Sequence, residues 1–248
     1  MAGSPGDLIA SEQDWLGPAR SHGLLSRLPE PLIASLIERG HRVRHPKGAV
    51  VMSWPNAATS VLVLEGALRA YLSDEDGRQV TTRYLRPGDI FGFVREVQAS
   101  LECHLEAIEQ SELLMIDQDR VERLAEGEPA FALALMEELR EIIASGLRAV
   151  YLRAFGTVRD RVANAILERA AVTGEIAAGR TVAGTQYELA MAAGSVREVV
   201  ANVLQELKRD GLIDVHRGGV VILAPDRLAR EARGRGWRRR EYGLKSAS

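Results

Sequence analysis

Arg197, Glu198 and Asn202 carry the side chains in this sequence that are best suited to reading nucleic-acid bases. They lie on the outer side of a helix predicted at about 196–209. The buried side of this helix is expected to hold Val199, Val200, Val203, Leu204 and Leu207. Arginine can donate two hydrogen bonds to guanine, glutamate can accept one from cytosine, and asparagine can pair with adenine. Arg197 and Glu198 fall in the first turn, the end that a recognition helix directs at bases. This pattern predicts hydrogen bonding to base edges rather than catalysis.

The stretch that presents these residues reads as two short helices. Thr185-Gln186-Tyr187-Glu188 is a capping box, and Ser195-Val196-Arg197-Glu198 repeats the pattern, which leaves room for about two turns in the first helix. Ala190, Gly194 and Val200 stand where a helix-turn-helix needs close approach, a positive φ and a filled space between helices. The alternative is that the two boxes cap two ordinary packed helices.

A hairpin and the distribution of charge favour DNA binding. Leu212–Val215 and Val220–Leu223 alternate about Arg217-Gly218-Gly219, which predicts a β-hairpin that would form a wing. Residues 1–152 hold 15 Lys and Arg against 23 Asp and Glu, whereas residues 153–248 hold 17 against 11. The net charge is only −2, but a polyanion would still be attracted to the C-terminal part.

A long helix is predicted before this region. Phe131 to Ala154 contains no Pro and one Gly, and its apolar residues recur at helical spacing. One row alternates steps of three and four, as in a coiled-coil seam. That row consists of Met136, Leu139, Ile143, Gly146 and Val150. A neighbouring apolar row can pack on the chain's own core, so we expect two copies to pair along the seam. A single buried core helix is the alternative.

The residues before this helix predict β-structure of the antiparallel barrel or double-sheet type, because short apolar runs alternate with Gly, Pro and Asp turns. The runs are Ala49–Met52, Val61–Leu64, Ala67–Leu72, Val80–Leu85 and Leu113–Ile116. Helices are expected at Pro31–Glu38 and Thr157–Ala171, and a connection at Thr173–Gly184. The predicted class is α+β, with a flexible N-terminus (1–20), a β-barrel (21–128), the long helix (129–154), a winged helix-turn-helix (155–226) and a basic tail (227–248).

In these features the chain resembles the cyclic AMP receptor protein/FNR superfamily of bacterial transcription regulators. The resemblance covers roughly His22 to Asp226, and Tyr84–Gly92, "YLRPGDIFG", is similar to that family's cyclic-nucleotide-binding barrel. It implies a homodimeric DNA-binding regulator and not an enzyme, whose sensor barrel sets the spacing of two recognition helices on an inverted-repeat operator. The implied partners are double-stranded DNA and, if the protein activates, RNA polymerase. A small-molecule effector in the barrel and the absence of any effector are both open.

The resemblance also assigns roles to residues. Arg197 and Glu198 match the family's base-reading pair, and Asn202 stands where the cyclic AMP receptor has another base-reading Arg. Val196 replaces the Ser that usually precedes the pair, a departure that bears on one phosphate contact. The expected DNA-binding residues are Thr185, Gln186, Tyr187, Ser195, Arg197, Glu198, Asn202 and Arg217.

Cyclic AMP is not the expected effector, because the residues that hold its phosphate in the family differ here. Gly92 is followed by Phe93 rather than Glu, and Leu101-Glu102 stand at the family's Arg-Ser positions, where a carboxylate would repel phosphate. One cysteine excludes an FNR-type iron–sulfur cluster. Cys103-His104 leaves haem ligation or thiol redox sensing open, against a buried structural cysteine. The cofactor is therefore unknown.

Other classes of function are open to the same sequence. The barrel could regulate a protein partner, with the C-terminal domain as an interaction module. A cupin-type oxygenase would need clustered His ligands, but only His104 lies centrally in the barrel region, beside Glu102 and Glu106. The segment from Arg227 to Arg240 holds seven Arg against Glu231 alone, which fits either an arm on the DNA backbone or a solubilising tail.

The sequence contains no sign of export or of membrane insertion. No apolar run approaches the ~18 residues of a membrane span, and the first residues lack a basic start followed by an apolar run. One cysteine permits no intrachain disulfide. We therefore expect a cytoplasmic protein with no membrane partner.

Overall fold

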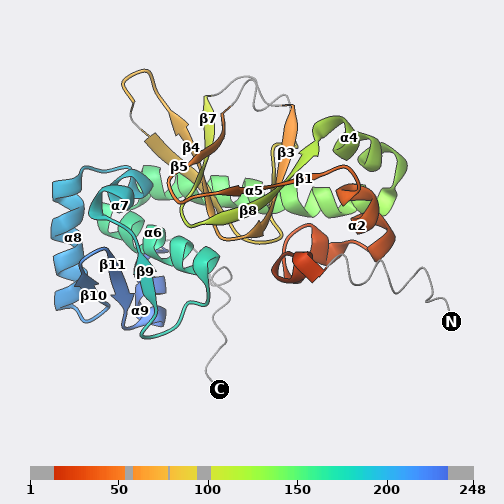
Figure 1. Ribbon diagram of the computed structural model, residues 1–248. Helices are drawn as coiled ribbons and strands as arrows, with labels where there is room; N and C mark the ends of the chain where they lie inside the picture. Colours follow the sequence, from red (N-terminus) through yellow and green to blue (C-terminus); the bar gives the residue numbers. More distant parts are fainter. Residues whose placement is uncertain (1–13, 54–57, 78, 94–101, 234–248) are drawn as a thin grey trace. The chain divides into compact units, whose positions relative to one another are not determined.

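The computed structural model describes residues 14–53, 58–77, 79–93 and 102–233 (Figure 1). The chain divides into two compact units. The first contains Met1–Ala70 and Leu85–Ile143, and the second contains Tyr71–Tyr84 and Ala144–Ser248. A short stretch of the predicted barrel, between Tyr71 and Tyr84, thus belongs to the same unit as the C-terminal helices.

The strands of the β part are β1 (His41–His45), β2 (Val50–Ser53), β3 (Thr59–Glu65), β4 (Leu68–Ser73), β5 (Gln79–Leu85), β6 (Ile90–Phe91), β7 (Cys103–Ala107) and β8 (Ser111–Asp117). They form two four-stranded sheets, in the orders β1-β8-β3-β6 and β2-β7-β4-β5. The pairs of β1 with β8, β3 with β8 and β6, and β2 with β7 are antiparallel. The predicted α+β class and all five predicted strand runs are confirmed.

The turn at Arg86–Asp89 is fixed by backbone and side-chain bonds. The Asp89 carboxylate accepts a hydrogen bond from the Arg86 amide at 3.0 Å, and Gly88 adopts a φ of +96°. Val63 of β3 then exchanges backbone bonds with this turn, from Gly88 N to Val63 O at 2.9 Å and from Val63 N to Asp89 O at 3.0 Å. The Pro-Gly-Asp signal therefore fixes where the turn meets β3.

Helical segments contribute side chains to the core of the first unit. They are η1 (Asp14–Ser21), η2 (Leu25–Arg27), α2 (Glu30–Ile37) and α4 (Gln118–Gly127). The prediction of a flexible N-terminus through residue 20 is wrong for residues 14–20, because Leu16 and Ala19 are fully buried in the core that contains Phe131. Residues 1–13 lie outside the described residues.

The long helix is α5 (Pro129–Phe155), which confirms the predicted helix within a residue or two at each end. Arg27 bonds Glu138, which is fully buried, and Glu141, at 2.6 Å. On α5, several apolar side chains lie in one row, and each of them is at least 60% exposed. This row, hereafter the α5 stripe, consists of Leu133, Met136, Ile143, Leu147 and Val150.

The C-terminal part contains α6 (Val158–Thr173), β9 (Thr181–Ala183), α7 (Gln186–Ala193), α8 (Arg197–Arg209), β10 (Ile213–His216), β11 (Gly219–Ile222) and α9 (Pro225–Glu231). Strand order in its sheet is β10-β11-β9. Two predictions are corrected here. The expected connection at Thr173–Gly184 contains β9. The expected tail begins within α9, whose Leu228 and Ala229, with Ala232 directly after the helix, are buried in the core of this domain.

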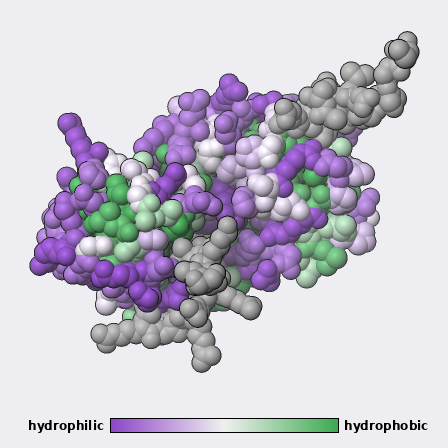
Figure 2. All heavy atoms as spheres, turned by 90° about the horizontal axis from the view of Figure 1, so that it is seen from below, coloured by the Kyte–Doolittle hydropathy of each residue, from purple (hydrophilic) through white to green (hydrophobic). Residues whose placement is uncertain are grey.

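The surface is mixed. On the face drawn in Figure 2, hydrophilic residues predominate and hydrophobic residues gather in separate patches. Within the ranges that the structure describes, no helix is long and apolar enough to cross a membrane.

Candidate nucleic-acid interface

The first helix of the motif, α7, is fixed at its start by its own sequence. The Thr185 hydroxyl accepts a hydrogen bond from the Glu188 amide at 3.1 Å, and the Glu188 carboxylate accepts one from the Thr185 amide at 2.6 Å. The predicted capping box is therefore confirmed. Leu189, Ala190 and Ala193 face the core, whereas at the start of α7 Tyr187 is exposed and Gln186 half-buried.

The turn between α7 and α8 has the hydrogen bonds of a Schellman motif. The Gly194 amide donates to Met191 O at 3.2 Å and the Ser195 amide to Ala190 O at 3.0 Å, with Gly194 at a φ of +57°. Ser195 therefore completes the end of α7, and α8 starts at Arg197, with Val196 as its N-cap and no side-chain cap bond. The prediction that Ser195 begins a second capping box is wrong, although the predicted turn at Gly194 is confirmed.

The recognition helix α8 separates a buried from an exposed face. Its buried residues are Val200, Val203, Leu204 and Leu207. Arg197 and Glu198 are exposed, as expected, and Asn202 is likewise exposed. Val199 was expected on the buried side, but its side chain is 39% exposed, beside Glu198 on the outer surface.

The hairpin that follows α8 is the predicted wing. His216 pairs with Gly219, and Gly218 at the turn has a φ of +91°. β11 also pairs with β9, so close that a Cβ on Gly219 would lie 2.5 Å from Val182 O. The Gly184 amide donates to Gly218 O at 2.8 Å. The two consecutive glycines thus permit the turn and its approach to the residue that precedes Thr185.

These elements enclose a cleft of about 500 Å³ between the start of α7, the start of α8 and the wing. Five of the predicted DNA-binding residues line it, namely Thr185, Gln186, Tyr187, Arg197 and Arg217. Its lining also contains Leu189, Leu204 and Val215, and His216, which the sequence analysis did not single out. Glu198 and Asn202 lie outside the cleft on the exposed face of α8, and Ser195 is half-buried in the turn.

One carboxylate beside the wing, that of Asp214, has basic partners within the domain. Lys208 lies 2.7 Å from one oxygen of Asp214, and His216 Nε2 lies 3.4 Å from the other. The hydrogen bond from Lys208, helped by the Val215 amide and by His216, lowers the pKa of Asp214. Asp214 therefore stays ionised near neutral pH. The cleft itself is lined by two arginines, Arg197 and Arg217, and by no carboxylate among the described residues.

The candidate sensor residues Cys103 and His104 are separated by the strand that carries them. Along β7 burial alternates, with Cys103 buried and His104 half-buried on the opposite face. Burial raises the pKa of the Cys103 thiol to about 11, against a smaller opposing effect of a backbone hydrogen bond. His104 Nδ1 lies 2.9 Å from the Ser53 hydroxyl. The two side chains therefore do not converge on one haem or metal.

The other residues named in the predicted sensor region are Leu101, Glu102 and Glu106. Leu101 lies outside the described residues, whereas Glu102 is exposed. Glu106 bonds the buried Arg69 at 2.6 Å. In the described part of the chain, no group of three or more His, Cys, Asp and Glu side chains could hold a metal ion.

A β-roll made of the two four-stranded sheets, a long helix and a winged helix-turn-helix with outward Arg197 and Glu198 define a class of DNA-binding regulator. Residues 42–128 match the model of the cyclic nucleotide-binding domain, and residues 160–231 match that of the Crp-like helix-turn-helix domain. The chain belongs to the cyclic AMP receptor protein/FNR superfamily of transcription regulators. Membership of this superfamily identifies it as a transcription regulator and not an enzyme.

Individual relatives agree with this assignment. The transcriptional regulator SdrP from Thermus thermophilus is 32% identical over 184 residues, which cover 70% of this chain and 84% of the relative. The cAMP-activated global transcriptional regulator CRP of Pasteurella multocida is 24% identical, over 78% of this chain and 95% of its own. A crystal structure of a CRP/FNR-family regulator, also from Thermus thermophilus, is 28% identical, with a TM-score of 0.66, over 79% of this chain and all of that one.

Proposed function

We propose that the protein is a homodimeric, cytoplasmic transcription regulator that reads an inverted-repeat operator with the first turn of α8. Arg197 and Glu198 contact base edges, Asn202 extends the reading face, and the cleft beside the wing receives the phosphate backbone of one strand. RNA polymerase is a further partner if the protein activates transcription.

The convergence of residues on one cleft carries this proposal. Thr185, Gln186 and Tyr187 at the start of α7, Arg197 of α8 and Arg217 of the wing come from three separate elements, yet they line one space. Backbone amides at a helix start and arginine side chains are groups that bind phosphate. The bases would then be within reach of the adjacent exposed face of α8.

The α5 stripe supports the dimer. Met136, Ile143, Gly146 and Val150 of the predicted seam are exposed, and Leu139 is half-buried. Leu133 and Leu147 extend the exposed apolar row, whose steps of three, seven, four and three residues keep it on one side of the helix, as in a surface that pairs two helices. Each side chain would be removed from water by a second copy of the same helix.

The effector does not use the phosphate contacts of the cyclic AMP receptor. Phe93, half-buried beside Gly92, stands at the position of the family's carboxylate, and the exposed carboxylate of Glu102 stands where phosphate would be held. We propose a small-molecule effector of different chemistry in the β-roll. The buried, protonated Cys103 weighs against thiol redox sensing.

The test begins by selecting duplexes from random DNA with the full-length protein. Alanine at Arg197 and at Glu198 should each relax base preference at particular positions of the selected half-site and weaken operator binding roughly tenfold. Gln205→Ala, also exposed on α8 but two turns further along, is the matched control. A double Arg197→Ala, Glu198→Ala variant that selects the same operator would overturn the proposal.

A further inference from the structure

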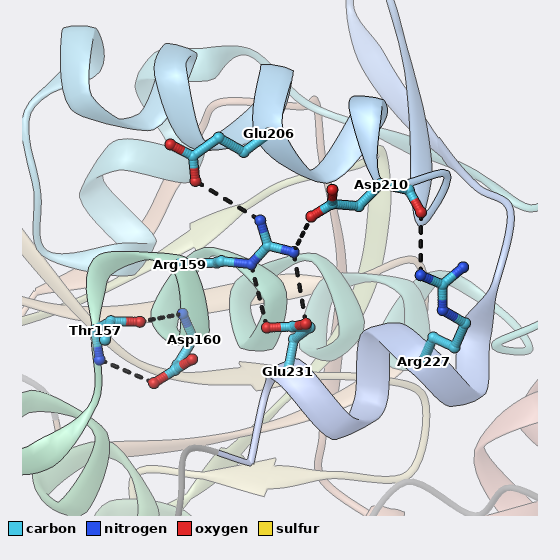
Figure 3. Close-up of polar contacts among 7 residues, drawn as sticks. All are labelled: Thr157, Arg159, Asp160, Glu206, Asp210, Arg227 and Glu231. Atoms are coloured by element: carbon cyan, nitrogen blue, oxygen red, sulfur yellow. Dashed lines mark hydrogen bonds and ion pairs between the residues drawn. The ribbon is translucent and has the colours of Figure 1, made fainter.

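A single guanidinium, that of Arg159, gathers three carboxylates in the C-terminal domain (Figure 3). Arg159 lies in the first turn of α6, and it is 2.6 Å from Asp210, 3.2 Å from Glu231 and 3.6 Å from Glu206. Glu206 lies in the last turn of α8, Asp210 directly after α8, and Glu231 at the end of α9. One side chain therefore joins the beginning of one helix to the ends of two others.

Each member of this cluster occupies an end of its helix where its charge is locally unfavourable. Helix C-terminal ends carry partial negative charge, and N-terminal ends carry partial positive charge. Glu206 and Asp210 are in addition like charges four residues apart. Charges placed unfavourably at helix ends are retained when contacts with other elements compensate for them, and sites of this kind are often functional.

The compensation comes from Arg159. Burial alone would lower the pKa of Arg159, but the hydrogen bonds to Glu231 and Asp210 outweigh it and raise that pKa. The Arg159 side chain is only 23% exposed, so solvent screens these ion pairs less than pairs at the open surface. Arg227 of α9 adds a bond at 3.1 Å to the carbonyl of Asp210.

We propose that Arg159 is a positioning residue for DNA reading, which holds the C-terminal end of α8 at a fixed place relative to the start of α6. The inference rests on the proposed function, since it concerns how Arg197 and Glu198 are aimed. Gly156 and Thr157 link the end of α5 to the start of α6. At the start of α6, Thr157 and Asp160 form a capping box. A change in the direction of that link is thereby carried to the recognition helix.

The consequence is selective for the operator. A misdirected α8 loses base contacts, whereas the start of α7 precedes α8 and is fixed by the Thr185–Glu188 capping box, so its backbone contacts are kept. Loss of Arg159 should therefore reduce the preference for the operator over random DNA. A purely structural role would reduce binding to both in parallel, in step with the loss of folded protein.

The experiment compares Arg159→Gln with Arg209→Gln in the full-length protein. Arg209 is exposed in the last turn of α8, and its replacement changes the charge equally. Dissociation constants are measured for the selected operator and for a random duplex of equal length, at a temperature where both variants are folded. We expect roughly a tenfold loss on the operator for Arg159→Gln and less than about twofold on random DNA.

A second variant separates positioning from charge compensation. Arg159→Gln is combined with Glu206→Gln, Asp210→Asn and Glu231→Gln, which removes the carboxylates together with their partner. The proposal expects the melting temperature to recover and the operator preference to stay low. Full recovery of operator preference, or an Arg159→Gln variant indistinguishable from Arg209→Gln on the operator, would overturn it. If the wild-type protein prefers no duplex at all, the proposed function fails together with the inference.

Discussion

Cys103 and His104 are neighbours whose chemistry is decided by which face of β7 they occupy. The sequence pairs a soft ligand with an imidazole, whereas strand alternation buries the first and leaves the second beside Ser53. A buried thiol with a raised pKa keeps its proton, and a protonated thiol is a poor nucleophile and a poor metal ligand. The pair therefore behaves as two separate residues.

This predicts slow thiol labelling. Because burial raises the pKa of Cys103 to about 11, a thiolate fraction on the order of 10⁻⁴ is present at pH 7. A chromogenic disulfide reagent should react slowly with the folded protein at pH 7, faster as the pH rises toward 11, and at once in denaturant. Stoichiometric labelling of the native protein within seconds at pH 7 would contradict the buried position.

For single residues, the sequence identifies candidate binding side chains better than it predicts which way each apolar side chain of a helix faces. Arg197, Glu198 and Asn202 were expected on the outer side of α8, and they are there. Val199 was placed inside on its apolar character, but the inner face of α8 is already filled by Val200, Val203 and Leu204. Which of two adjacent valines faces the core depends on the packing of the other helices, which no local pattern contains.

The turn between α7 and α8 is the element on which the motif depends. Gly194 has a φ of +57°, and a Cβ there would lie 2.5 Å from the Arg153 guanidinium, the flexible end of a side chain. Gly211, after α8, has a φ of +67° but open space around it. At both positions a side chain would strain the backbone, but only at Gly194 would it also collide with a neighbouring side chain.

Alanine at either position should therefore destabilise the domain by about 1 kcal/mol through the left-handed backbone. Gly194→Ala should cost more than Gly211→Ala, because Arg153 must move. Urea unfolding of both variants measures the difference. Equal free energies of unfolding would mean that Arg153 yields without cost, and a smaller loss at Gly194 would contradict the described turn.

Element boundaries show where pattern reading ends. Capping at Thr185 and the Gly-rich hairpin were predictable, because their signals are local. Ser195 follows the same capping pattern yet completes the turn after α7, since its amide is already bonded to Ala190. β9 has three residues and exists through its pairing with β11, and α9 is held by the core, so neither has a sufficient signal of its own.

At the scale of the whole molecule, the proposed dimer depends on the apolar side chains of the α5 stripe. Five large apolar side chains in one row are exposed in a single copy, and burying one Ile or Leu is worth about 1.5–3 kcal/mol. In a symmetric pair each substitution counts twice. The stripe therefore makes the state of association sensitive to single changes.

Ile143→Glu should weaken the proposed dimer by more than about a hundredfold and weaken operator binding with it, because two linked recognition helices bind an inverted repeat better than one. Sedimentation velocity gives the state of association. Ala130→Glu, exposed on the first turn of α5 outside the stripe, is the control and should remain dimeric. A dimeric Ile143→Glu protein would place the interface elsewhere.

The docking of α9 has a practical consequence for anyone who shortens this chain. A cut after Asp226, where the sequence changes character, would remove Leu228, Ala229 and Ala232 from the core and Glu231 from Arg159. A cut after Arg233 removes only the remaining arginine-rich residues. The first truncation measures the cost of opening a hydrophobic core, and the second measures what basic residues add to DNA affinity. The two would be confused if the boundary were chosen from composition alone.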